Sequence, residues 1–280
     1  MIDRSPQKEV TIGIPLYSNT ASTLELFSFV QCCKILGHYP FSIITFKELD
    51  VKLFTDKLKE YNVRYDIKYF DPSFFKDVNG YNRLMVSCVF YDAFSAYKYL
   101  LIYQLDAFVF SDQLSRWCAK DYDYVGAPWL NVKWINKKEI NKKLPLFAQV
   151  PFLFKLLKGK DGLVGNGGFS LRKVSSHLKF AKVYSSIFLS LNFNEDLFWG
   201  KYIAAKESDF KIPLMREALS FSIENDPAEA FRLLHNELPF GCHAWYKNDK
   251  QIWQIIFEKA AIELSLIPNL KSNLVYGKDK

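Results

Sequence analysis

A single acid, Asp106, stands inside the mostly apolar run from Tyr103 to Phe110. A carboxylate is costly in apolar surroundings unless it is paired, hydrogen-bonded or bound to a metal ion. Ligands in open α/β sheets lie at the carboxyl ends of strands, so Asp106 at the end of a buried strand could bind Mg²⁺ or Mn²⁺ through hard oxygen atoms. The alternative is a buried acid that accepts hydrogen bonds from backbone donors.

A glycine cluster, Gly165 to Gly168, precedes the run Phe169-Ser170-Leu171-Arg172. Glycines allow the backbone to approach a sugar or a diphosphate closely, whereas the plainer interpretation is a hairpin turn. A dinucleotide-binding fingerprint is disfavoured, because Ser170 stands at its third glycine position and no first strand precedes it.

An acid pair and a histidine are further candidates later in the chain. Glu195 and Asp196 follow Asn194, which predicts an ordinary helix start with Asn194 as the cap and two acids in the first turn. The functional interpretation is that one carboxylate takes the proton from an attacking hydroxyl group. His243 lies among aromatic residues, where a lone histidine is more often structural than a ligand.

Alternating strand and helix patterns predict the elements that position these residues. The run 99–110, apolar on both faces, indicates a central strand of a mostly parallel sheet. The first hundred residues are therefore typical of a Rossmann-like half. We expect strands over 10–16, 41–46 and 65–70, and helices over 21–36, 51–61, 82–97 and from Glu195 to about Ala204.

Composition limits the class of protein. The chain has 280 residues, of which 49% are hydrophobic, enough for one large α/β domain. Its five cysteines are odd in number and include no C-x-x-C pair, which argues against a disulfide framework and a zinc site. The polar start of the sequence and the absence of a long apolar stretch lead us to expect a cytoplasmic protein without a signal peptide or a membrane span.

Positive charge is concentrated in residues 131–160, which carry eight lysines and one glutamate and so match the net charge of +7 of the whole chain. Because the rest of the chain is balanced, we expect no nucleic-acid partner. Aromatic residues alternate with these lysines. The segment is therefore expected either to dock on an anionic membrane surface or to cover an acceptor site.

Four motifs, taken in order, resemble those of bacterial GT-A-type glycosyltransferase-like proteins, over roughly residues 10–253. The resemblance implies a single α/β domain over 1–280, with a GT-A-like, Rossmann-type mixed sheet flanked by helices. Within it, about 10–110 would form the nucleotide-binding half, 111–253 the acceptor and catalytic half, and 254–280 a C-terminal helix and tail. The motifs are YQLDAFVF at 103–110, GNGGFSLR at 165–172, NED at 194–196 and FGCHAW at 240–245.

The same resemblance implies roles for individual residues. Asp106 and His243 would hold Mn²⁺ or Mg²⁺, with Gln104 in place of the first acid of a D-x-D motif. Asp196 would be the catalytic base, with Glu195 as the alternate. Donor-binding residues would be Pro15, Leu16, Tyr17, Asn82, Arg83, Gln104 and Asp106, and acceptor-binding residues Trp129, Gly167, Gly168 and Ser170.

The implied activity is metal-assisted, inverting transfer of a sugar from a nucleotide sugar, with a UDP-sugar favoured, to a glycan or lipid-linked glycan. The implied setting is bacterial surface polysaccharide synthesis, in the cytoplasm or on the inner face of the cell membrane. The missing first acid favours an alternative, a non-catalytic nucleotide-sugar binder or membrane-docking scaffold. A phosphoryl or nucleotidyl transferase is a weaker third hypothesis, because the chain has no P-loop.

Overall fold

The structure is a computed structural model, and it describes residues 8–130, 163–190, 194–247 and 249–260. The lysine-rich segment 131–160 lies outside the described residues, as does most of the predicted C-terminal tail. The interpretations that concern these parts therefore stay predictions.

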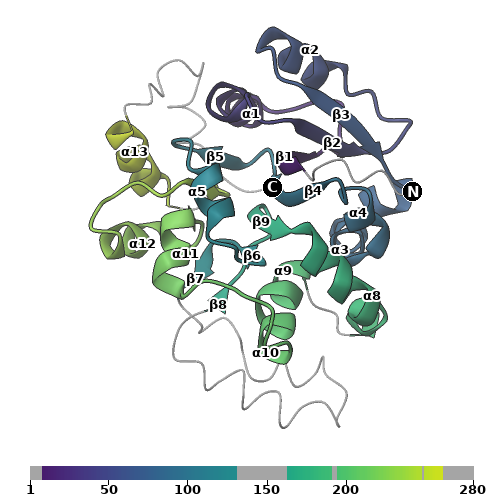
Figure 1. Ribbon diagram of the computed structural model, residues 1–280. Coiled ribbons are helices and arrows are strands. Elements are labelled where there is room, and N and C mark those ends of the chain that lie inside the picture. The colour runs from purple at the N-terminus through teal and green to yellow at the C-terminus, as the bar shows by residue number, and fades with distance from the viewer. Residues whose placement is uncertain (1–7, 131–162, 191–193, 248, 261–280) are drawn as a thin grey trace.

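A six-stranded mixed sheet forms the centre of the molecule (Figure 1). Its first four strands run parallel, and β9 pairs antiparallel with both β4 and β6. This arrangement confirms the mixed α/β sheet expected from the sequence. In sheet order the strands are β3 (Tyr65–Tyr69), β2 (Phe41–Thr45), β1 (Lys8–Pro15), β4 (Tyr97–Tyr103), β9 (Phe169–Lys173) and β6 (Tyr124–Val125).

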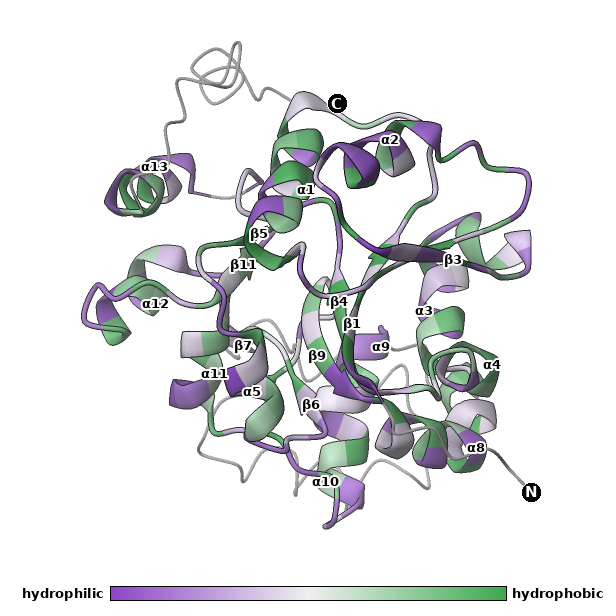
Figure 2. Ribbon diagram, turned by 45° about the horizontal axis from the view of Figure 1, so that its top comes forward, coloured by the Kyte–Doolittle hydropathy of each residue, from purple (hydrophilic) through white to green (hydrophobic). Residues whose placement is uncertain are grey.

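Helices cover both faces of this sheet. Successive side chains of a strand point to opposite faces, and on β4 Leu101 packs into one core cluster while Leu100 and Ile102 pack into another. In Figure 2, β1 and β4 are largely hydrophobic, as two-sided burial requires. The first cluster receives α1 (Thr23–Leu36), α2 (Lys52–Glu60) and α5 (Leu114–Ala119), and the second α3 (Val78–Val86), α4 (Cys88–Asp92) and α8 (Val174–Ser190).

A second, three-stranded sheet lies beside the main sheet. Its middle strand β11 pairs parallel with β10 and antiparallel with β5. A third core cluster lies between this sheet and the last helices, with Trp245 and Trp253 almost fully buried. The elements are β5 (Ala107–Val109), β10 (Ser222–Ile223), β11 (Gly241–His243), α11 (Met215–Phe221), α12 (Pro227–Leu233) and α13 (Lys250–Lys259).

The expectation of one strand over 99–110 is wrong. The chain leaves the main sheet after Tyr103, turns through Gln104 to Asp106, and enters the small sheet as β5. The turn is closed by the amide of Ala107, which donates to the carbonyl of Gln104 at 2.9 Å. Asp106 therefore lies in the turn that joins the two sheets.

Two predicted helices are also corrected. The helix over 82–97 is two short helices, α3 and α4, because Ser87 adopts an extended conformation and its side chain caps α4. The helix from Glu195 begins as α9 (Glu195–Leu197), continues as a π-helical segment (Phe198–Ile203) and ends as α10 (Ala204–Lys206). The remaining elements are a 3₁₀ turn (Pro72–Phe75) and the paired strands β7 (Pro128–Trp129) and β8 (Leu163–Val164).

All five cysteines are described; none forms a disulfide, and four are buried. Among the described residues, none of the helices combines the length and the apolar character needed to cross a bilayer.

Candidate active site

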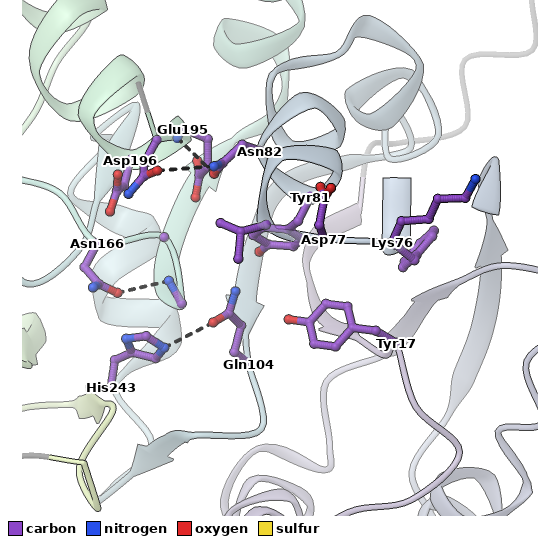
Figure 3. A pocket seen from close by; sticks show the side chains of 15 residues that line it. Tyr17, Lys76, Asp77, Tyr81, Asn82, Gln104, Asn166, Glu195, Asp196 and His243 are labelled. Carbon is purple, nitrogen blue, oxygen red and sulfur yellow. Dashed lines mark hydrogen bonds between the residues drawn. The ribbon is translucent and has the colours of Figure 1, made fainter. Parts of the chain in front are cut away.

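A pocket of about 550 Å³ opens near the carboxyl ends of β1 and β4, which Tyr17 and Gln104 follow. In Figure 3, Tyr17 lies on one side of the pocket, and Asn166, His243 and Asp196 lie on the other. This is the edge of the sheet where ligands bind in open α/β proteins. Eight residues singled out in the sequence line it: Tyr17, Asn82, Gln104, Gly167, Gly168, Glu195, Asp196 and His243.

Four of the predicted donor-binding residues, Asp106 among them, lie outside the pocket lining. Pro15 and Leu16 are buried beneath the surface, and Arg83 is exposed on α3. Asn82 lines the pocket, but its side chain is engaged with the start of α9. Its Oδ1 accepts a hydrogen bond from the amide of Glu195 at 3.2 Å, and its Nδ2 donates to Oδ1 of Asn194 at 3.3 Å.

Asn194 therefore does not cap α9 with its side chain, contrary to the expectation from the sequence. Because Asn82 lies on α3, the contact fixes the start of α9 against α3 at the pocket wall. The acid pair that follows Asn194 is held in place by this contact.

Two of the predicted acceptor-binding residues also lie outside the pocket lining. Ser170 is fully buried, and its hydroxyl group donates to the carbonyl of Gly167 at 2.9 Å, which does not fit a direct contact with an acceptor. Trp129 is half-buried, and its ring packs so closely on Gly165 that a Cβ atom there would come within 2.4 Å of it.

His243 lies among three side-chain acceptors at the base of the pocket. Its Nε2 is 2.9 Å from Oδ1 of Asp106 and 3.2 Å from Oε1 of Gln104, and its Nδ1 is 3.2 Å from Oε1 of Glu224. Asp106 does not line the pocket itself but supports His243 from behind. Its other oxygen, Oδ2, accepts a hydrogen bond from Nζ of Lys247 at 2.6 Å.

The charges of this cluster compensate one another. Burial lowers the pKa of His243, but hydrogen bonds and charge attraction from Asp106 and Glu224 outweigh it and raise the pKa to about 9. Burial raises the pKa of Asp106, but His243 and Lys247 hold it well below its usual range. The positive charges of His243 and Lys247 therefore balance the negative charges of Asp106 and Glu224.

The donor set of this cluster fits a divalent cation. Asp106 and Gln104 offer carboxylate and amide oxygens, and His243 offers an imidazole nitrogen, all types that bind Mn²⁺. The contact between Nδ1 of His243 and Glu224 is the outer hydrogen bond that a metal-binding histidine usually makes. Within the described ranges, no three His, Cys, Asp or Glu side chains form a metal-type group, so Gln104 or a ligand would complete the set.

The glycine loop is shaped by its neighbours. A Cβ atom at Gly167 would lie 1.7 Å from Oε1 of Glu195, and one at Gly168 would lie 2.0 Å from Nε2 of His243. Asn166 has a φ of 125°, and its Oδ1 accepts a hydrogen bond from the amide of Gly168 at 3.0 Å. Only glycines allow the loop to pass so close to both functional side chains.

Glu195 forms a buried ion pair. Its Oε1 accepts a hydrogen bond from Nη2 of Arg172 at 2.9 Å, and the side chains of the pair are 3% and 0% exposed. Arg172 also donates to Ser170 at 3.0 Å and to Tyr91 at 3.1 Å. Among the residues that the structure describes, the buried Oε2 of Glu195 has no hydrogen-bond partner, and Glu195 lines the pocket. The carboxylate therefore has an acceptor available for a hydrogen-bond donor of a ligand.

Asp196 lies beside this pair but has a different environment. Burial, followed by the negative charge of Glu195, raises the pKa of Asp196 to about 7, and Glu224 adds to the effect. The amide of Leu197 donates to its Oδ1 at 2.7 Å, which opposes the shift. A carboxyl group with a near-neutral pKa in a pocket is suited to accept and release a proton.

Sequence reasoning missed several residues of this site. Glu224 and Lys247 contact the His243–Asp106 pair, and Tyr81 and Asn166 line the pocket. The hydroxyl group of Tyr81 is buried. Asn166 stands within the glycine motif and could have been found, whereas Glu224 and Lys247 lack any local signal.

Solved structures with a similar fold include three glycosyltransferase chains. GlyE from Streptococcus pneumoniae TIGR4, described as a glycosyltransferase, matches with a TM-score of 0.50 and 11% identity, over 96% of this chain and 64% of that chain. Mouse xyloside xylosyltransferase 1 matches with a TM-score of 0.49 and 8% identity, over 84% and 97% of the two chains. Core-mannan synthase A from Aspergillus fumigatus, in a Mn/GDP form, matches with a TM-score of 0.47 and 10% identity, over 71% and 70%.

The likeness to GlyE and the mixed sheet flanked by helices confirm the expected GT-A-like fold. The chain spans about two thirds of the length of GlyE. No curated protein is significantly similar to the chain in sequence. A family model described as "Protein of unknown function (DUF5672)" matches residues 64–243, which include every described element from β3 to the end of β11. The chain therefore belongs to the DUF5672 family.

Proposed function

We propose that this protein is a glycosyltransferase that moves a sugar from a nucleotide-sugar donor to a hydroxyl group of an acceptor. One observation carries the proposal. A single pocket at the carboxyl edge of the sheet joins a cation-type donor set around His243 to a carboxyl group, Asp196, with a pKa of about 7. A diphosphate leaving group needs positive charge, and an attacking hydroxyl group needs a base.

The donor would lie between Tyr17 and the glycine loop. Tyr17 is 46% exposed at the pocket, so its ring offers a face for a nucleobase. Gln104 and His243 lie at the base of the pocket, near the backbone of Gly168. Asp106, His243 and Gln104 would hold Mn²⁺ or Mg²⁺, which, when bound, would supply positive charge for the diphosphate.

Asp196 would act as the catalytic base. Its carboxylate takes the proton of the acceptor hydroxyl as that oxygen forms a bond to the anomeric carbon. The bond from this carbon to the diphosphate oxygen breaks at the same time, and its electron pair leaves with the nucleoside diphosphate. Such a single displacement inverts the anomeric configuration. Glu195 is less suited to this role, because Arg172 already binds its carboxylate. Its free Oε2 would instead accept a hydrogen bond from a sugar hydroxyl group.

The finer assignments rest on the motif resemblance to bacterial GT-A-type proteins. They are a UDP-sugar as donor, a glycan or lipid-linked glycan as acceptor, and bacterial surface polysaccharide synthesis as the setting. We also propose a cytoplasmic location, with contact to the inner face of the cell membrane through residues 131–160.

A panel of UDP-, GDP- and CMP-sugars tests the proposed function. We expect release of a nucleoside diphosphate or monophosphate from one donor, even without acceptor, since water can replace the hydroxyl group. NMR of the transferred product would give its anomeric configuration. A retained configuration would reject the single displacement at Asp196.

A non-catalytic nucleotide-sugar binder is the second candidate. The contact between Lys247 and Asp106 favours it, because an ammonium group holds a carboxylate oxygen that a metal ion would need. Gln104 in place of the first acid points in the same direction. Tight binding of a nucleotide sugar without hydrolysis or transfer would support this alternative.

A further inference from the structure

The small sheet places three polar side chains in a row. β10 and β11 run parallel and pair Ile223 with Cys242, so the next residues along the two strands, Glu224 and His243, are neighbours. β11 and β5 run antiparallel and pair His243 with Ala107, so Asp106, the residue before Ala107, lies opposite Ala244, the residue after His243. The amide of Ala244 donates to the carbonyl of Asp106 at 2.9 Å and extends this pairing. Backbone pairing therefore sets the order Glu224, His243, Asp106.

Glu224 is held on both of its oxygens. Oε1 lies 3.2 Å from Nδ1 of His243. Oε2 accepts hydrogen bonds from Nδ2 of Asn166 and from Nδ2 of Asn225, the latter at 3.3 Å. The side chain is only 14% exposed, so water competes little for these contacts. An acid held this firmly fixes the direction of the hydrogen bond that it accepts.

Asn166 connects this acid to the wall of the pocket. The same side chain that donates to Glu224 through Nδ2 accepts a hydrogen bond from the amide of Gly168 through Oδ1. Gly168 in turn lies against Nε2 of His243. Glu224 and the glycine loop therefore hold the imidazole ring from two sides.

The geometry points to Glu224 as a positioning residue of the cation site, which holds Nδ1 of His243 so that Nε2 faces Asp106 and the pocket. This inference rests on the cation site of the proposed function. It adds a residue that touches neither the donor nor the cation. A cation bound at Nε2 would displace the proton from that nitrogen, and the remaining proton on Nδ1 would donate to Glu224 and fix the direction of the ring.

The affinity for Mn²⁺ tests the inference without any sugar or nucleotide. Free Mn²⁺ is measured by electron paramagnetic resonance during titration of the full chain. Loss of an outer-shell partner typically weakens metal binding, so we expect Glu224→Ala to lower the affinity roughly 10- to 100-fold. Glu224→Gln keeps an oxygen that can accept from Nδ1, and it should restore a large part of the affinity.

Glu229→Ala is the matched control. It removes the same charge from an exposed acid on α12 that, within the described ranges, pairs with Arg232 of the same helix. Its Mn²⁺ affinity should equal that of the unmodified chain, which separates positioning from net charge. Circular dichroism and thermal unfolding without metal ions verify that each variant is folded.

The outcomes separate the inference from the proposed function. If the folded Glu224→Ala variant binds Mn²⁺ as tightly as the unmodified chain, Glu224 does not position His243. If Glu224→Gln is as weak as Glu224→Ala, the acid acts through its charge, and the positioning role is overturned. If the unmodified chain binds no Mn²⁺, the cation site itself is rejected. The donor hydrolysis assay then still tests sugar transfer independently.

Discussion

Glu195 and Asp196 are adjacent acids, yet the fold gives them opposite chemistry. Arg172 compensates the charge of Glu195 at 2.9 Å inside the core. Asp196 lines the pocket and forms no ion pair with any described residue, and burial raises its pKa to about 7. The difference arises because successive side chains in the first turn of α9 point in different directions, which the sequence alone does not reveal.

Substitution of Asp196 by Asn should lower turnover by roughly a hundredfold or more, because the amide cannot accept the proton. Donor affinity should change little. In the unmodified chain kcat should rise with pH through about 7, since the base must first lose its proton. Initial rates between pH 5 and 9 measure both effects. Asp77→Asn makes the same change at another acid of the pocket lining and is the control. A near-normal rate for Asp196→Asn would exclude the role.

The same acid should make stability depend on pH. Its pKa is about 7 in the folded chain, above the ordinary value of 3.8, so the unfolded chain releases the proton first. The contribution of Asp196 to stability is therefore fully present below about pH 4 and is lost as the pH rises towards 7. Asp196→Asn should remove this loss. Urea unfolding of both chains at pH 5 and pH 8 measures it, and an equal stability difference at the two pH values would contradict the expectation.

Asp106→Asn should leave the fold intact and remove most of the metal-dependent donor binding. The change keeps the volume but removes the charge that a cation needs, and it also frees Lys247. Calorimetry with UDP or GDP, with and without Mn²⁺, compares the two chains. Asp112→Asn, an acid of the exposed loop before α5, is the control. Unchanged Mn²⁺-dependent affinity in Asp106→Asn would show that the cation binds elsewhere.

At the scale of elements, a buried ion pair joins β9 to α9. Arg172 on β9 binds Glu195 on α9, and both side chains are almost fully buried. The contact holds the start of α9, and with it Asp196, at the pocket. Removing two charges from water costs free energy, which offsets much of the attraction between them. The ion pair therefore fixes the position of α9 more than it increases the net stability.

Arg172→Met should destabilise the protein by about 3–5 kcal/mol, because it leaves the carboxylate of Glu195 buried and uncompensated. The double variant Arg172→Met with Glu195→Gln should recover much of this loss, since no unpaired charge remains. Denaturant unfolding of the two single variants and the double variant measures the coupling. Additive effects would mean that the two side chains do not depend on each other.

Elements also explain how much the sequence predicts. The strands β1 to β3 and the helices α1 and α2 are long enough for hydrophobic patterns to appear, and their predicted bounds agree with the structure within a few residues, whereas the strand predicted over 99–110 is divided between β4 and β5. The strands of the small sheet contain two or three residues each, too few for any pattern. The sequence therefore predicts Asp106 and His243 as candidates through motifs, but their neighbours Glu224 and Lys247 arise only from pairing between distant segments.

At the scale of the whole molecule, both halves of the chain contribute to the pocket. Tyr17 and Gln104 come from the first half, and Asn166, Asp196 and His243 come from the second. The first half of the chain is therefore not sufficient to form the pocket, because the loop before the antiparallel strand β9 and the small sheet complete its lining. The alternation of strand and helix patterns predicts most elements of the first half. In the second half, where the proposed chemistry would take place, only the motifs point to candidate residues.

The lysine-rich segment gives the last prediction, which concerns the chain as a whole. Residues 131–160 lie between β7 and β8, and these two strands pair through Pro128 with Val164. The segment therefore leaves and rejoins the described fold at one point. Trp129 packs on Gly165 there, beside the glycine loop of the pocket.

We expect the full chain to co-sediment with vesicles that contain anionic lipid, at low salt, and to be released at high salt. Each lysine near such a surface contributes about 1 kcal/mol at most, and salt screens the attraction. Replacing Lys137, Lys138, Lys142 and Lys143 by Gln should reduce binding strongly. The control replaces the exposed Lys34, Lys52, Lys59 and Lys182 by Gln and removes the same charge elsewhere. Equal loss in both variants would indicate a general charge effect, and a chain that stays in solution with anionic vesicles would exclude membrane docking.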